Sequence, residues 1–167
     1  MRIKLVTLWL LALSAPGLAE EPRYVFQQIN VLVAHHDNRF SLRVWPDGRA
    51  DMRFPAYAVN AGHYRWQLEP EQLAALDAHF RQLAQMDLPG MEARMRSETS
   101  DKLVTVADAD LLRLELRDEQ RAPIEVLMES PQAWSSVLPD VAELSRLADV
   151  QAGIFEWMQE HVEVLER

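Results

Sequence analysis

The residues best suited to metal or acid–base chemistry in this sequence are His35, His36 and Asp37. Imidazole and carboxylate groups bind Zn²⁺ and act as general acids and bases. Neighbouring side chains of a strand point to opposite faces, so both histidines could bind one ion only if the chain bent there. His63 is then the best candidate for a third ligand. A metal-dependent or hydrolytic enzyme centred on these three histidines is one hypothesis, and a solvated pair at the end of a strand is the simpler alternative.

Other catalytic patterns are absent from the sequence. No serine occupies a G-x-S-x-G turn, and the glycines are too isolated to form a phosphate-binding loop. Met91 and Met95 are spaced for a soft-metal site, although methionine pairs serve more often as apolar filler. We therefore predict no catalytic residue, no cofactor and no bound metal.

A second group of candidate residues alternates with apolar ones between residues 40 and 54. Two alternating runs flank Pro46-Asp47-Gly48, a sequence typical of a tight turn. The pattern predicts a β-hairpin in which the apolar side chains share one face. On the other face, Arg43 should form an ion pair with Asp51, and Trp45 should contact Arg49.

A further strand, predicted around residues 63–68, extends this polar face. Guanidinium groups suit carboxylates and phosphates, and Trp and Arg are enriched at protein interfaces. The face could bind an anionic ligand or the acidic surface of another protein. Alternatively, it is a solvated sheet whose arginines pair with acids of the C-terminal helix, such as Glu160, Glu163 or Glu166. The predicted binding residues are Arg43, Trp45, Arg49, Arg53, His63 and Arg65.

The elements that must position these side chains follow the order strands then helix, twice. Pro70 should open the first helix, and Ser130-Pro131 should open the second helical region, which continues to the C-terminus. This order predicts an α+β fold, with an antiparallel sheet and helices packed on one face. Further expectations are strands at 24–34, 103–107, 112–116 and 124–128, a long loop at 87–102, and helix breaks near Pro139 and Gly153.

The N-terminus has the three parts of a secretory signal. Two basic residues precede an apolar run from Leu5 to Leu13, and a small-residue cleavage site follows near Ala19. The run is too short for the roughly 20 residues of a membrane span, which argues against an uncleaved anchor. We predict a signal peptide over residues 1–19 and a single α+β domain over 20–167, exported to the periplasm or beyond. No membrane span is expected after cleavage.

The composition limits the partners of this domain. The chain has no cysteine, so disulfides cannot stabilise it, and its formal net charge is −9. Nucleic acid is an improbable partner for such an acidic chain, because phosphate binding requires clustered Lys and Arg. The expected partners are an acidic protein or an anionic ligand.

The layout of the sequence also resembles an uncharacterised domain found in exported bacterial proteins. The resemblance rests on the hairpin from Phe40 to Phe54 and on the aromatic strand and helix from Tyr64 to Leu83, with a looser echo at Asp108-Ala109. Members of that family are expected to carry cysteines near the first hairpin. In this chain the corresponding stretch, residues 38–41, contains no cysteine. The resemblance implies the fold and brings no known activity.

Overall fold

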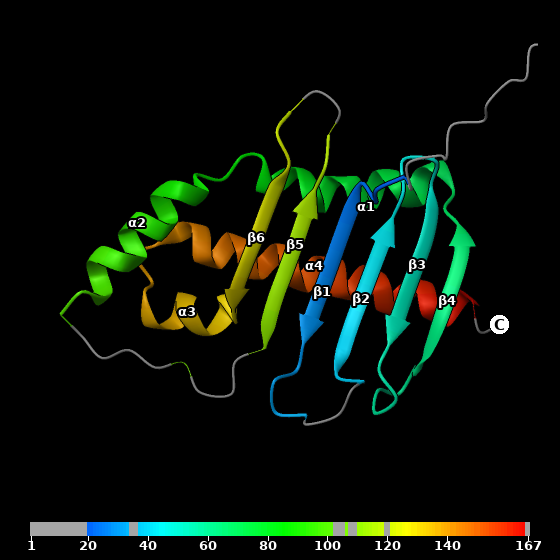
Figure 1. Cartoon of the computed structure of the whole chain (residues 1–167), viewed down its shortest axis with the longest axis horizontal. Coiled ribbons are helices and arrows are strands. Elements are labelled where there is room, and N and C mark those ends of the chain that lie inside the picture. Colours follow the sequence, from blue (N-terminus) through cyan, green and yellow to red (C-terminus); the bar gives the residue numbers. More distant parts are fainter. Residues whose placement is uncertain (1–19, 34–36, 102–105, 107–109, 119–120, 166–167) are drawn as a thin grey trace, which may run out of the picture.

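A computed structural model describes residues 20–33, 37–101, 106, 110–118 and 121–165. Within these residues the chain forms a six-stranded antiparallel sheet in the order β4-β3-β2-β1-β5-β6. The helices lie on one side of the sheet (Figure 1). The α+β fold is confirmed, and the order strands then helix occurs twice. The strands are β1 (Tyr24–Ile29), β2 (Arg39–Val44), β3 (Arg49–Phe54), β4 (Gly62–Gln67), β5 (Leu111–Leu116) and β6 (Ile124–Glu129), and the helices are α1 (Pro70–Leu83), α2 (Leu88–Thr99), α3 (Pro131–Val137) and α4 (Ala142–Leu165).

The predicted β2–β3 hairpin is confirmed in its register. Leu42 pairs with Met52 across the strands, and both side chains are fully buried. Gly48 has φ of +84°, a conformation that glycine adopts without steric cost, and its N–H donates to the carbonyl of Trp45 (2.9 Å). The alternation of the sequence therefore sorts the hairpin into a buried apolar face and an exposed polar face.

The first strand ends at Ile29, whereas the prediction extended it to residue 34. The side-chain amide of Asn38 donates to the carbonyl oxygens of Asn30 (3.0 Å) and Val33 (3.3 Å), which holds the chain in a turn. The Asn30 side chain also accepts from the N–H of Leu32 (3.1 Å), as asparagine does at turns. The predicted strand at 103–107 lies outside the described residues, apart from Val106.

The predicted loop at 87–102 is wrong, since residues 88–99 form helix α2. Asp87 caps this helix by accepting a hydrogen bond from the N–H of Gly90 (3.0 Å), and Pro89 occupies its first turn, where proline is tolerated. Met91 and Met95, one helical turn apart, pack against the core. Their role is thus apolar packing, the more common use of methionine pairs.

The predicted break near Gly153 is also wrong, because α4 continues through it to Leu165. A Cβ atom at this position would lie only 2.5 Å from the His79 ring of α1, so Gly153 allows α1 and α4 to approach closely. The other predicted break is confirmed, since α3 ends at Val137 and α4 begins at Ala142, on either side of Pro139.

The core lies between the sheet and helices α1 and α4. Each fully buried large apolar side chain contributes about 1.5–3 kcal/mol relative to an exposed one, so this layer supplies much of the folding free energy. The helices cover one face of the sheet and leave the other face to solvent (Figure 1). Among the described helices, none is long and apolar enough to cross a membrane. The largest fully buried side chains are Tyr24, Phe26, Phe80, Leu42, Met52, Leu76, Leu83, Leu112, Leu114, Leu144, Leu147 and Ile154.

Candidate anion-binding groove on the exposed face of the sheet

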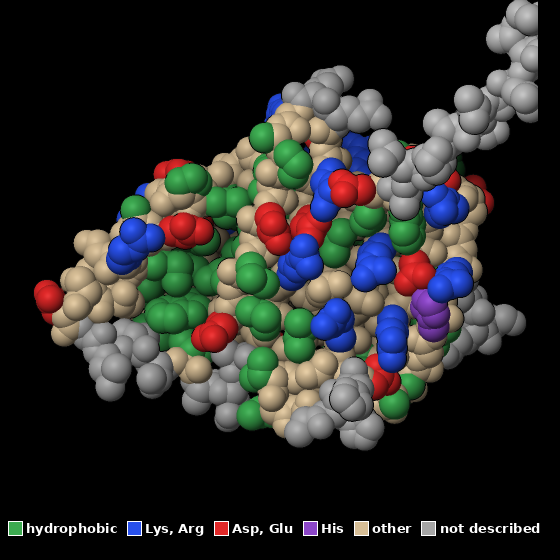
Figure 2. Space-filling model, viewed as in Figure 1, with side chains coloured by type: hydrophobic (Ala, Val, Ile, Leu, Met, Phe, Trp, Pro, Cys, Tyr) green, Lys and Arg blue, Asp and Glu red, His purple; other side chains and the backbone are tan. Residues whose placement is uncertain are grey.

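Basic side chains gather on the exposed face of the sheet over β2, β3 and β4 (Figure 2). Side chains two residues apart on a strand share a face, and pairing in register brings those of adjacent strands together. They surround a shallow groove of about 350 Å³. Four of the predicted binding residues line it, together with five other side chains. The full lining is Gln27, Asp37, Arg39, Ser41, Arg43, Asp51, Arg53, His63 and Arg65.

Asp51 stands in the middle of this groove and is neutralised from β4. Its Oδ2 atom accepts hydrogen bonds from Nε2 of His63 and Nε of Arg65, both at 2.9 Å. Partial burial raises the pKa of Asp51, but the hydrogen bonds from His63 and Arg65 outweigh it and hold the pKa below its ordinary value. The carboxylate is therefore charged near neutral pH and already hydrogen-bonded to both His63 and Arg65.

The predicted ion pair between Arg43 and Asp51 is wrong, although the two residues are paired in register as expected. The carboxylate of Asp51 is taken by the β4 side chains instead. Within the described residues, neither Arg43 nor its neighbour Arg39 has a carboxylate within ion-pair distance, and both are exposed. Arg53, by contrast, is paired with Asp37 at 2.7 Å. The groove thus holds four arginines against two aspartates, and Arg39 and Arg43 are its uncompensated cations.

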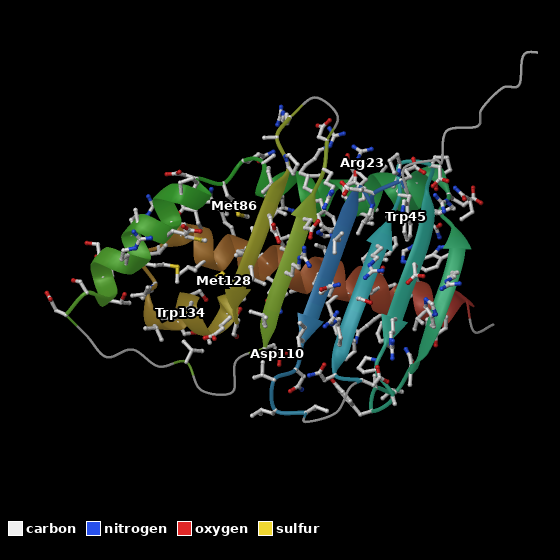
Figure 3. The ribbon with its side chains drawn as sticks, in the orientation of Figure 1. Arg23, Trp45, Met86, Asp110, Met128 and Trp134 are labelled. Atoms are coloured by element: carbon white, nitrogen blue, oxygen red, sulfur yellow. The ribbon has the colours of Figure 1, made fainter. Side chains whose placement is uncertain are left out.

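Trp45 and Arg49, also predicted to bind a ligand, lie outside the groove at the end of the hairpin (Figure 3). Nε1 of Trp45 donates to the carbonyl of Glu20 (2.9 Å), and the Arg49 guanidinium binds the carboxylates of Glu20 (3.1 Å) and Asp47 (2.6 Å). Arg49 also stacks over the Trp45 ring at 5.2 Å, which confirms the predicted contact. These two side chains hold residue 20 against the sheet, and they line a neighbouring hollow of about 490 Å³.

Among the described residues, no acid of helix α4 pairs with these arginines. The helix packs on the opposite face of the sheet (Figure 1), so the pairing suggested with Glu160 is wrong. The side chains of Glu163 and Glu166 lie outside the described part of the chain. The carboxylates that pair with arginines of β3 and β4 come from residues 20, 37, 47 and 51, which lie on the sheet itself or beside it.

Two of the three histidines of the enzyme hypothesis, His35 and His36, lie outside the described residues. His63 is hydrogen-bonded to Asp51. In the described ranges, no three His, Asp or Glu side chains are grouped so that they could hold a metal ion. The metal-dependent or hydrolytic enzyme therefore stays a prediction.

Five lining residues were not among the predicted binding residues. Asp51 was predicted on this face as the partner of Arg43, Asp37 was named only as a possible metal ligand, and the other three were not predicted. Arg39 and Ser41 precede Arg43 on β2 by four and two positions, so the same alternation would have placed them on this face. Gln27 reaches the groove from β1, where it pairs with Ser41. Its position depends on which strand lies beside β2, and the local sequence pattern does not supply that information.

A larger hollow of about 560 Å³ lies at one end of the sheet, lined in part by Arg23, Asp77 and Arg81. Here the central carboxylate, Asp77, accepts hydrogen bonds from Arg23 and from the buried Tyr24 hydroxyl and pairs with Arg81, so both cations are already used. Burial, together with the hydrogen bond to Asp77, raises the pKa of Tyr24 well above its ordinary value. The two arginines beside Asp77 are thus paired, whereas Arg39 and Arg43 of the groove over β2–β4 have no carboxylate within ion-pair distance among the described residues. Arg121 also lines this hollow.

No family model, no curated protein and no solved structure matches this chain.

Proposed function

We propose that this chain is an exported, non-enzymatic binding module that holds an anionic ligand in the groove over β2, β3 and β4. The observation that carries the proposal is the pair of uncompensated cations, Arg39 and Arg43, beside the paired arginines of the same groove. A protein of net charge −9 in which two exposed guanidinium groups have no carboxylate partner among the described residues has the chemistry for an external anion.

The spacing of the groove indicates a ligand with more than one anionic group. Arg39 and Arg43 are four residues apart on one strand, or about 13 Å between Cα atoms at the usual rise per residue. Ser41 lies between them and pairs in register with Arg53 of β3. A guanidinium fork can bind a carboxylate or a phosphate in bidentate fashion, and the Ser41 hydroxyl can donate to the same ligand. A chain of phosphates or an acidic peptide segment matches this arrangement better than a single small anion.

Calorimetric titration with two probes, inorganic tripolyphosphate and a tetraglutamate peptide, tests the proposal. We expect wild-type protein to bind at least one of them with an affinity that falls as salt is raised, because exposed charges are screened. The double variant Arg39→Glu/Arg43→Glu should bind at least tenfold more weakly. Arg96→Glu/Arg146→Glu, which reverses two exposed arginines on α2 and α4, is the matched control and should bind as wild type does.

Two outcomes would contradict the proposal. One is that neither probe binds to the wild type. The other is that the groove variant and the Arg96→Glu/Arg146→Glu control, which carry the same change in charge, lose affinity equally, which would mean that only overall charge matters. Circular dichroism of both variants should match the wild type, since neither Arg39 nor Arg43 makes an ion pair with the described residues.

The predicted signal peptide supports export of this module. Expression of the full chain in a bacterial host, followed by intact-mass measurement of the periplasmic fraction, tests it. We expect a mature chain that begins at Glu20. Recovery of the uncleaved chain from the membrane fraction would contradict this part of the proposal.

A further inference from the structure

Large apolar side chains are exposed on two loops at the same end of the sheet. Six such side chains stand out among the described residues, and Leu127 and Val137 are the two that lie elsewhere. The other four lie in the connection between β1 and β2 or in the connection between β3 and β4. They are Val31 (53% exposed), Leu32 (65%), Tyr57 (48%) and Val59 (103%).

These two loops are adjacent because antiparallel pairing brings them to the same end of the sheet. Ile29 pairs with Arg39 at the end of β1, and Phe54 pairs with Gly62 at the end of β3. In Figure 1 the coloured parts of both connections lie at the lower edge of the sheet, opposite the end that carries Trp45 (Figure 3).

The loops are also fixed to one another. The carboxylate of Asp37, in the first loop, accepts hydrogen bonds from Arg53 and from the backbone N–H of Ala56 at the start of the second loop, both at 2.7 Å. The Tyr57 ring packs edge-on against Phe40 with centroids 6.0 Å apart. These contacts join described parts of the two loops to each other and to the sheet. This lowers the entropic cost of binding through their apolar side chains.

The groove opens directly onto these loops. Arg39, one of the two uncompensated cations, is the first residue of β2 after the β1–β2 connection, and Arg53 contacts that connection through Asp37. Figure 2 shows the same relation, with blue side chains over the lower part of the sheet and green ones at its lower edge. Aliphatic tips beside arginines form a surface suited to the boundary between hydrocarbon and charged head groups.

We propose that Val31, Leu32, Tyr57 and Val59 dock the protein on an anionic phospholipid surface, with these apolar side chains inserted and the groove arginines on lipid phosphates. This inference rests on the anion-binding function proposed above and names its partner. The apolar residues protrude from loops, and Val59 is completely exposed, so they need a yielding apolar medium and no shaped pocket. Since the whole chain is acidic, attraction to an anionic surface has to come from this local cluster.

Co-sedimentation with lipid vesicles tests the inference, with tripolyphosphate titration of the same samples as the second arm. Vesicles that mix phosphatidylglycerol with phosphatidylcholine should bind the wild type, and pure phosphatidylcholine vesicles should not. The variant Leu32→Asp/Val59→Asp should bind the anionic vesicles roughly tenfold more weakly, because it places charge where apolar side chains would insert. Its affinity for tripolyphosphate should stay unchanged within twofold.

The matched control is Leu127→Asp/Val137→Asp, which adds the same two charges at the other two exposed apolar side chains, on β6 (62% exposed) and α3 (44%), away from the two loops. It should bind vesicles as the wild type does. If the wild type binds tripolyphosphate or tetraglutamate but not anionic vesicles, the membrane inference is wrong while the proposed function stands. If the loop variant binds vesicles as tightly as the wild type, the inference is also wrong. If the wild type binds no probe and no vesicle, the proposed function fails and the inference fails with it.

Discussion

Two carboxylate-centred arginine clusters share the exposed face of the sheet, and only one of them is electrostatically closed. In the β5 cluster, Glu115 pairs with Arg113 and Arg117 and its side chain is only 7% exposed. Further acids flank those arginines, because Arg117 also pairs with Glu21 and Arg113 lies 3.3 Å from Glu125. Each cation of this cluster therefore has a carboxylate.

The β3 cluster consists of Asp51 with Arg43 of β2 and with His63 and Arg65 of β4. Its strand shows the same alternation of arginine with an acid. Its acid, Asp51, is held by His63 and Arg65, and no further carboxylate reaches Arg43 within the described residues. Alternation of Arg with Asp or Glu along a strand therefore does not by itself determine whether the arginines form structural ion pairs or stay available for a ligand. The outcome depends on whether the adjacent strands and termini supply enough acids to cover every guanidinium group.

The largest expected contrast between the clusters is in stability. Glu115→Gln should lower the free energy of unfolding by about 2 kcal/mol, because two guanidinium groups lose a buried acceptor. Asp51→Asn should cost less than about 1 kcal/mol, because its partners remain hydrated. Urea unfolding followed by circular dichroism measures both values. Equal losses would mean that the two clusters are alike and that the comparison is mistaken.

In ligand binding, Asp51 should differ from an acid that lies far from the groove. Asp51→Asn removes a negative charge from the groove and should tighten tripolyphosphate binding roughly threefold at low salt. Asp149→Asn, an exposed acid on α4 in the other layer, is the control and should change the affinity little. Calorimetric titration gives both numbers, and a weaker affinity for Asp51→Asn would argue against an anion in this groove.

A smaller effect concerns the pH dependence of the β3 cluster. The hydrogen bonds from β4 keep the pKa of Asp51 below its ordinary value, despite partial burial that raises it. The unfolded chain binds this proton with a pKa of about 3.9, so Asp51 contributes stability above that pH and loses it as the pH falls through the lower folded-state pKa.

An NMR pH titration of the Asp51 carboxyl carbon should therefore give a midpoint below about 3.9. In Arg65→Gln the midpoint should rise, because one of the two stabilising hydrogen bonds loses its charge. A wild-type midpoint at or above the ordinary aspartate value would show that Arg65 does not hold the carboxylate in solution.

The smallest effects are expected at the end of the hairpin, outside both clusters. Trp45→Phe removes the hydrogen bond to the Glu20 carbonyl and should lower the free energy of unfolding by about 1 kcal/mol or less. Its tripolyphosphate affinity should match that of the wild type. A marked loss of affinity would return Trp45 to the binding site and enlarge the groove.

The features that are local in sequence were predictable. Alternation on both sides of Pro46-Asp47-Gly48 gave the hairpin and its register, and Pro70 marked the start of α1. Four of the six predicted binding residues line the groove for the same reason, since a period of two fixes the face on which each side chain lies.

Features that depend on distant neighbours were not predictable in this way. Arg43 and Asp51 were expected to pair, but β4 lies beside β3 and places Arg65 opposite Asp51 as well. Gly153 was interpreted as a helix break, and its actual reason is the His79 ring on a different helix. Pro89 and Gly90 favour a helix break, so the local sequence does not predict α2. The Asp87 cap and the core contacts of Met91 stabilise a helix there.

Whether Arg39 and Arg43 bind the anion can be tested directly by following individual arginine side chains during a ligand titration. In ¹H–¹⁵N NMR spectra, the Nε–Hε signals of Arg39 and Arg43 should shift and saturate as tripolyphosphate is added. Those of Arg113 and Arg117 should stay in place, because their guanidinium groups already bind Glu115. Equal shifts at all four arginines, or shifts confined to the β5 pair, would contradict the account of an open β3 cluster and a closed β5 cluster.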